Sequence, residues 1–181
     1  PGSDHQSHGN TDFTPWYLQQ MAAYEQAHAV RLLDYLDLHI YPQVSGVFSE
    51  NEGNADVQAA RLRSTRQLWD PTYVHEGWIG QPVYLIPRMQ QWVEDHYPGT
   101  KTAITEYNWG GLEHINGALT QADVLGILGR EGVDLAILWG ALEPDMPWAY
   151  AFRIYRNYDG AGGKFGDTSV LASSSDQSQL S

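Results

Sequence analysis

Residues 101–111 read KTAITEYNWGG, and this stretch decides the fold. A short run of apolar and β-branched residues ends directly in a glutamate, which aromatic, amide and glycine residues follow. The pattern predicts a strand over residues 101–105 that leads into Glu106. Two other segments end in the same way, with the letters DLHIYP at residues 37–42 and LWG at residues 138–140. Polar or aromatic groups therefore stand where each of three predicted strands ends.

Helical and extended patterns alternate along the rest of the chain. The predicted helices cover residues 14–28, 56–69, 87–96, about 120–132 and 148–158, and the predicted strands cover residues 32–40, 101–105 and 134–139. Thr14 is expected to cap the first helix, and Thr120 with Asp123 resembles a capping box for the fourth. The strand over 134–139 is largely apolar, so we expect it to be buried on both faces.

The order of these elements defines a fold class. Strands that alternate with helices are typical of a parallel sheet with right-handed crossovers. Three parallel strands alone make a narrow sheet with open edges. We therefore predict an α/β fold in which residues 1–159 form part of a (β/α)8 TIM barrel. Residues 160–181 are rich in glycine and serine and form either a linker or the first part of a β-domain.

Composition limits the partners and the chemistry. Ten Lys and Arg residues face 22 Asp and Glu residues, which gives a formal net charge of −12. This balance argues against nucleic acid and anionic membrane as partners, and it suits a neutral polysaccharide. The chain contains no cysteine, no apolar run of membrane-spanning length and no signal peptide. Most of its seven Trp and eleven Tyr residues are expected in the core, and a minority to stack on sugar rings.

The glutamate at the end of the central predicted strand is the main candidate for catalysis. In a barrel, catalytic residues lie where strands end and the following loops begin. There Glu106 would present its carboxylate from a rigid position, as the nucleophile of a glycosidase requires. His39 and Trp139 mark the other two strand ends, so a carboxylate, an imidazole and an indole are expected to converge. The alternative is an exposed loop glutamate, which the aromatic residues after it disfavour.

Metal and cofactor sites find little support in the sequence. Asp4, His5 and His8 bring ligand types close together, but no further ligand follows at a suitable spacing. The acidic run over residues 50–56 has oxygen ligands for calcium and is also typical of a solvated loop. No zinc, P-loop or dinucleotide fingerprint occurs. We predict neither a cofactor nor a metal.

The stretch TEYNWGG at residues 105–111 resembles the nucleophile strand of glycoside hydrolase family 44. Residues 34–42 and 148–160 resemble the same family. The resemblance implies a retaining endo-β-1,4-glucanase that also acts on xylan or xyloglucan. It implies that the chain runs from the helix after barrel strand five through strand eight and its helix. It further implies a secreted bacterial protein and a tail that leads to a β-sandwich domain.

The resemblance also assigns roles to single residues. It implies that Glu106 is the nucleophile, that His39 and Tyr41 line the −1 subsite from strand six, and that Trp139 lies under the sugar at strand eight. The residues that follow the nucleophile are expected to contact substrate as well. These are Tyr107, Asn108 and Trp109.

The acid/base glutamate of the family belongs to an Asn-Glu motif on strand four, which the resemblance places outside this chain. Asn51 and Glu52 have the right letters but lie in a loop after the sixth strand. The chain is therefore expected to be inactive alone and to require the N-terminal half of the barrel. Self-association through the open edges is the other expected partnership.

Several positions depart from the family pattern and place mostly apolar groups near the expected active site. They are Ile40, His75, Ile137, Ala141, Leu142 and Met146. Two alternative interpretations stay open at this point: an engineered barrel fragment with a remodelled pocket, and a non-catalytic carbohydrate-binding remnant. A divergent relative of the family would show the same departures.

Overall fold

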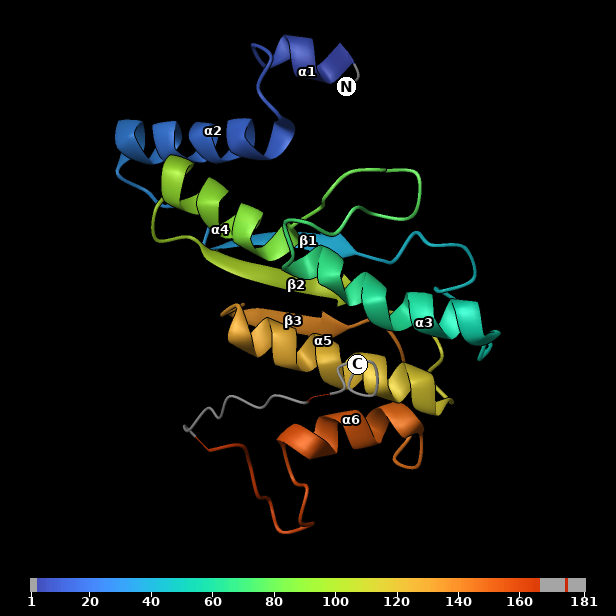
Figure 1. Cartoon of the computed structure of the whole chain (residues 1–181). Helices are drawn as coiled ribbons and strands as arrows, with labels where there is room; N and C mark the ends of the chain where they lie inside the picture. Colours follow the sequence, from blue (N-terminus) through green and yellow to red (C-terminus); the bar gives the residue numbers. More distant parts are fainter. Residues whose placement is uncertain (1–2, 167–174, 176–181) are drawn as a thin grey trace.

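The computed structural model describes residues 3–166 and Ser175. Helices and strands alternate along the chain, as Figure 1 shows. The elements are α1 (Ser3–Ser7), α2 (Phe13–His28), β1 (Tyr35–Ile40), α3 (Ala55–Arg63), the 3₁₀ helix η1 (Ser64–Leu68), α4 (Leu85–His96), β2 (Lys101–Tyr107), α5 (Ile115–Arg130), β3 (Leu135–Leu138) and α6 (Pro147–Tyr155). Among the described residues, no helix is long and apolar enough to cross a membrane.

The strands form one parallel sheet in the order β1-β2-β3. Helices join consecutive strands, because α3, η1 and α4 connect β1 to β2 and α5 connects β2 to β3. The predicted α/β class with a small parallel sheet is confirmed. The first strand begins three residues later than predicted, at Tyr35, and the second continues through Glu106 to Tyr107.

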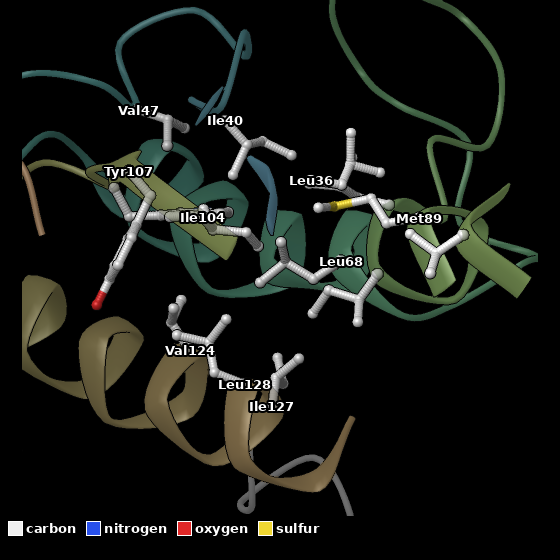
Figure 2. Packing of buried hydrophobic residues seen from close by; sticks show 14 of the residues in the cluster. Leu36, Ile40, Val47, Leu68, Met89, Ile104, Tyr107, Val124, Ile127 and Leu128 are labelled. Atoms are coloured by element: carbon white, nitrogen blue, oxygen red, sulfur yellow. The ribbon is translucent and has the colours of Figure 1, made fainter. Parts of the chain in front are cut away.

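The hydrophobic core lies between the sheet and its helices (Figure 2). Leu36 and Ile40 of β1 and Ile104 and Tyr107 of β2 are at most 8% exposed. They face apolar side chains of the helices, namely Leu68 of η1, Met89 of α4 and Val124, Ile127 and Leu128 of α5. Burying a side chain of this size contributes about 1.5–3 kcal/mol, so this layer anchors the sheet to one side.

The third strand is not buried as predicted. Leu135 is 42% exposed and Ile137 is 49% exposed, and every residue of β3 is exposed or only partly buried. The expectation of burial on both faces is therefore wrong for this chain. Its apolar composition has no counterpart among the described residues, since no described element packs over the face opposite the helices.

Two predicted helix caps were wrong. Helix α5 begins at Ile115, so Thr120 lies inside it, and its hydroxyl donates to the carbonyl of Asn116 at 2.9 Å. Asp123 accepts a hydrogen bond from Thr65 at 2.7 Å instead of capping the helix. Helix α2 begins at Phe13, with Asp12 and not Thr14 in the cap position. Thr and Asp at this spacing also fit a helix interior, where a hydroxyl can bond back to the preceding turn.

After α6 the chain reverses direction. Arg156 and Lys164 form an antiparallel bridge, and the ring of Phe165 stacks on Tyr155 at 4.8 Å. The predicted tail over 160–181 is therefore ordered against α6 at its start. The remainder of that prediction falls on residues 167–174 and 176–181, which lie outside the described residues.

A fully buried arginine joins the loop after β1 to the end of β2 and to α5. The side chain of Arg61 is 0% exposed, and its donors go to uncharged oxygens. They bind the carbonyls of Val47 (3.3 Å), Asn51 (3.0 Å), Glu52 (2.8 Å) and Trp109 (3.1 Å) and the side-chain oxygen of Asn116 (2.6 Å). Burial lowers the pKa of Arg61, because removing the charged guanidinium from water is unfavourable. Hydrogen bonds from every side offset that cost.

We expect Arg61→Ala to lower the free energy of unfolding by about 3–5 kcal/mol, because several buried carbonyls lose their donor together. Arg63 on the same helix is the matched control. It is 43% exposed and pairs with Glu76 at 2.7 Å at the surface, so Arg63→Ala should cost about 1 kcal/mol or less. Urea denaturation followed by circular dichroism measures both. Equal losses in the two variants would contradict the role given to Arg61.

Candidate active site

A β-bulge in β2 positions the predicted nucleophile. Asp37 of β1 pairs with Ala103 of β2. The next pair joins His39, two residues further along β1, to Glu106, three residues further along β2. Strand β2 therefore carries one extra residue between these pairs, and its pairing with β3 shifts over the same stretch. A bulge of this kind reverses the side on which the following side chains point.

Burial shows the effect of the bulge. Ile104 and Tyr107 are three residues apart, yet both are buried in the core under the helices. Strict alternation would put Glu106 on the same side as Ile104, inside that core. Because of the bulge, Glu106 instead lies on the open side of the sheet and faces His39.

The bulge is bound by a neighbouring carboxylate. The backbone N–H of Thr105 donates to Oδ1 of Asp37 at 2.9 Å, and the hydroxyl of Thr105 bonds Oδ2 of the same side chain. The ring of His39 lies beside this pair, with Nε2 3.4 Å from the Thr105 hydroxyl and 3.9 Å from Asp37 Oδ2. Asp37 thus occupies the polar groups of Thr105 and contacts the imidazole next to Glu106.

Two side chains from the end of β1 hold the Glu106 carboxylate. The hydroxyl of Tyr41 donates to Oε1 at 2.8 Å, and Nδ1 of His39 lies 3.4 Å from Oε2. The Glu106 side chain is 27% exposed, so it remains open to a ligand. The pKa of Tyr41 rises to about 12, chiefly because burial disfavours the phenolate. Glu106 also raises it, because this residue accepts the hydrogen bond of the Tyr41 hydroxyl and is negatively charged. The structure thus brings together three of the predicted site residues.

Trp139 lies at the neighbouring strand end. Its backbone N–H donates to the carbonyl of Tyr107 at 3.0 Å, and its side chain is 60% exposed. Asn108 holds it there, because the Asn108 amide donates to the Trp139 carbonyl at 2.7 Å. The other end of that amide accepts from the N–H of Gly110 at 2.6 Å. Asn108 therefore positions the backbone through both ends of its amide, and its contact with substrate stays a prediction.

Two further predicted contact residues belong to the core. Tyr107 is 2% exposed, and its hydroxyl accepts a hydrogen bond from Gln121 at 2.9 Å. Trp109 is 0% exposed, and its indole N–H donates to Ser64 at 3.1 Å. The prediction that they contact substrate is wrong for the structure described, because their rings pack under α3, η1 and α5. They lie one and three residues beyond Glu106, and side chains at such odd spacings point to the opposite side of a strand.

A pocket of about 460 Å³ adjoins this site. Its lining residues come from the loops after β1, β2 and β3, and they are Phe48, Ser49, Glu50, Asn108, Gly110, Leu112, Glu113, Trp139, Gly140, Ala141 and Met146. The Phe48 ring contacts the Tyr41 ring edge-on at 4.8 Å, which connects the pocket to Glu106. Sequence analysis missed Phe48, Glu50 and Glu113 as site residues, because loop residues carry no periodic signal.

The six unusual positions separate in space. Ala141 and Met146 line the pocket, whereas Ile40 is 8% exposed within the core and Ile137 lies on the open side of β3. His75 is 3% exposed, its Nδ1 accepts from the N–H of Gly77 at 3.0 Å, and burial lowers its pKa. The remaining residue, Leu142, is 37% exposed. Of the six positions, Ala141 and Met146 are thus the ones that line the pocket.

Potential metal ligands are dispersed. Within residues 3–166, no three His, Cys, Asp or Glu side chains are grouped to hold an ion. His5 lies 3.4 Å from Asp12, and His8 stacks on Trp16 at 4.0 Å. In the acidic loop, the carbonyls of Asn51 and Glu52 accept hydrogen bonds from Arg61.

A carboxylate held by a phenol and an imidazole thus lies beside an exposed indole at the carboxyl edge of a parallel sheet, where the active sites of barrel enzymes are found. Comparison with known proteins identifies the family. The model of glycoside hydrolase family 44 matches residues 1–44. The beta-mannanase/endoglucanase A of Caldicellulosiruptor saccharolyticus is 41% identical over 184 residues, which cover 91% of this chain and 14% of that protein.

Solved structures give the same result. A bifunctional glucanase-xylanase from a metagenome library is 50% identical, with a TM-score of 0.89, over 96% of this chain and 33% of that one. A family 44 xyloglucanase of Paenibacillus polymyxa, solved with xyloglucan, is 40% identical with a TM-score of 0.84, over 96% of this chain and 35% of that one. The chain is part of a glycoside hydrolase family 44 protein, and it spans about a third of the length of these solved relatives.

The hydrogen bond between Tyr41 and Glu106 predicts a titration. In the native chain the Tyr41 hydroxyl should lose its proton at about pH 12. Glu106→Gln removes one negative charge and the carboxylate acceptor, so the Tyr41 pKa should fall toward its ordinary value of 10.0 without reaching it, because burial is the larger cause. NMR of ring-labelled tyrosine, assigned with Tyr41→Phe, measures both values. An unchanged Tyr41 pKa in Glu106→Gln would contradict the contact.

The raised Tyr41 pKa also predicts how the free energy of unfolding depends on pH. The folded pKa lies above the unfolded value, so the contribution of Tyr41 is fully present below pH 10 and is lost as the pH rises through about 12. Stability should therefore fall over this window more steeply in the native chain than in Tyr41→Phe. Denaturant midpoints at several pH values provide the measurement, and parallel curves would contradict it.

Proposed function

We propose that this chain supplies the nucleophile half of the active site of a retaining endo-β-1,4-glucanase, with Glu106 as the nucleophile. The observation that carries the proposal is the environment of Glu106. Its two oxygens face Tyr41 and His39, and its side chain remains partly open. A carboxylate that is held by two side chains and still open to a ligand is well placed to attack an anomeric carbon.

The same proposal gives the other site residues their roles. Tyr41 and His39 orient the carboxylate and border the sugar that reacts, and the exposed indole of Trp139 provides an apolar surface for a pyranose ring. In a retaining reaction, Glu106 forms a bond to the anomeric carbon as the glycosidic bond breaks. A second carboxylic acid protonates the departing oxygen and later activates the water that releases the sugar.

We propose that this acid/base residue lies outside the chain. The two carboxyl groups of a retaining site lie about 5 Å apart. Asp37, the nearest acid along β1, is engaged by the N–H and hydroxyl of Thr105. Glu52 belongs to a loop whose backbone binds Arg61 on the helical side of the sheet. Neither suits a role that requires a free carboxyl group opposite Glu106.

The exposed edges and open side of the sheet support a half-barrel. β1 and β3 each have one neighbour within the described residues, and Leu135 and Ile137 are large apolar side chains in contact with water. In a (β/α)8 barrel, the remaining strands would pair with both edges and cover these side chains. We assign residues 1–159 to the part of that barrel from the helix after strand five through strand eight and its helix, with residues 160–181 leading to a further domain.

For the substrate we propose β-1,4-glucan, with xyloglucan and xylan as related polymers. The relatives are named as endoglucanase, glucanase-xylanase and xyloglucanase. These names, together with the Glu106 site, favour an enzyme over a non-catalytic remnant or an unrelated remodelled pocket. Because such polymers do not cross membranes, we place the protein outside the cell.

The test is reducing-sugar release from xyloglucan and hydroxyethyl-cellulose. The chain is assayed alone and after mixing with the remaining barrel segment of the metagenome glucanase-xylanase, to which it is 50% identical. We expect the lone chain to be slower than the assembly by at least ~10²–10⁴, the usual contribution of general acid/base catalysis. Full activity of the lone chain would overturn the half-site assignment.

The nucleophile assignment has its own control. Glu106→Gln should abolish the activity of the assembly, because an amide oxygen does not form the glycosyl intermediate. Glu94→Gln, on the exposed side of α4, should leave the activity unchanged. Retention of activity in Glu106→Gln would show that another residue is the nucleophile.

A further inference from the structure

The pocket beside Glu106 shares Trp139 with the proposed glucanase site, but its other lining residues have no role in the chemistry described so far. We propose that it is a sugar-binding subsite that accepts an uncharged pyranose unit and rejects a uronic acid, with Phe48, Glu50 and Glu113 as its specificity-determining residues. This inference rests on the proposed glucanase function and adds the charge class of the substrate. Its volume of about 460 Å³ falls within the range of roughly 300–1,000 Å³ that is usual for small-ligand pockets.

The pocket is continuous with the reaction centre. Phe48 lines it and contacts the ring of Tyr41 at 4.8 Å, and the hydroxyl of Tyr41 donates to Glu106. Trp139 lines the pocket from the end of β3, the strand next to that of Glu106. A sugar bound in this pocket is therefore a unit of the polysaccharide chain that reacts at Glu106, or a branch attached to the reacting unit.

The walls suit the two kinds of surface on a pyranose. Phe48 is 53% exposed and Trp139 is 60% exposed, so both rings are available to pack on the C–H groups of a sugar. Leu112 and Met146 add apolar surface between them. The carboxylates of Glu50 and Glu113 supply acceptors for sugar hydroxyls, and bonds of this charge-assisted kind are strong.

The charge of the pocket has one sign. Glu50 and Glu113 are its ionisable lining residues, and no Lys, Arg or His lines it. Over the part of the chain that the structure describes, neither carboxylate takes part in an ion pair. A sugar carboxylate in the pocket would meet two negative charges and no lining cation, because the nearby Arg61 is buried behind the loop with its donors bound to the carbonyls of Val47 and Asn51. A neutral unit would meet only hydrogen-bond acceptors.

The pocket is held in shape before any ligand binds. Arg61 fixes the carbonyls of Val47 and Asn51 on either side of the segment that carries Phe48 and Glu50. The opposite wall approaches closely at Gly110, where a Cβ atom would lie 2.5 Å from the carbonyl oxygens of Val47 and Ser49. Such preorganisation of the loop backbone lowers the entropic cost of binding.

The experiment measures binding of two matched ligands to the full chain by isothermal titration calorimetry. One is a cello-oligosaccharide, and the other has the same length but carries a C6 carboxylate on every unit, so that whichever unit enters the pocket is charged. We expect the acidic ligand to bind on the order of tenfold more weakly at low salt. The difference should shrink at 1 M salt, where the Debye length is ~3 Å.

Variants locate the effect. Glu50→Gln combined with Glu113→Gln should raise the affinity for the acidic ligand severalfold relative to the neutral one. Glu52→Gln removes one negative charge two residues from Glu50 but outside the pocket lining. It should leave the ratio of the two affinities unchanged. Phe48→Ala should weaken the neutral ligand about tenfold, in line with a lost stacking contact of ~1–1.5 kcal/mol.

The outcomes separate this inference from the proposed function. An equal change in Glu52→Gln and in the double variant, or no discrimination by the native chain, would overturn the charge-selective subsite. Neutral binding that is lost in Trp139→Ala but unaffected by Phe48→Ala would also overturn it, while leaving the glucanase site intact. Absence of binding to any β-glucan oligosaccharide would also overturn the subsite, whereas inactivity of the assembly with the remaining barrel segment would overturn the proposed function.

Discussion

The extra residue in β2 is the constraint on which the site depends. It allows Tyr107 to enter the core and Glu106, its neighbour, to face the open side of the sheet beside His39. Asp37 stabilises this irregular stretch by accepting both polar hydrogens of Thr105. The position of the carboxylate is thus set by the backbone of two strands and does not rely on a flexible loop, as nucleophilic attack requires.

The aromatic residues that follow the glutamate serve the same end from the other side of the sheet. Tyr107 bonds Gln121 of α5, and Trp109 bonds Ser64 of η1, so two buried rings anchor the strand end to two different helices. Asn108 between them binds the backbone at Trp139 and Gly110. A segment that reads like a ligand-binding motif is therefore largely an anchor for the single residue before it.

How much the sequence predicts depends on the range of the interactions involved. Strand and helix positions follow from local periodicity, and they were predicted to within a few residues apart from the start of α5 and the short helix α1, which was not predicted. The cluster of Glu106, His39 and Tyr41 follows from strand ends that meet at one edge. The bulge depends on pairing between strands, so local periodicity did not show that Glu106 faces away from the core while Tyr107 and Trp109 enter it. Phe48 and Glu50 reach the pocket through a loop whose path Arg61 determines.

The way in which Arg61 holds that loop has a consequence for sequence divergence. It binds main-chain oxygens of Val47, Asn51 and Glu52, and every residue type provides such an oxygen. The contacts by which Arg61 holds the loop are therefore independent of the side chains exposed at Phe48 and Glu50. Substitutions at Phe48 or Glu50 change the surface offered to a sugar while the backbone stays in register, so selection can alter substrate preference here without a loss of foldability.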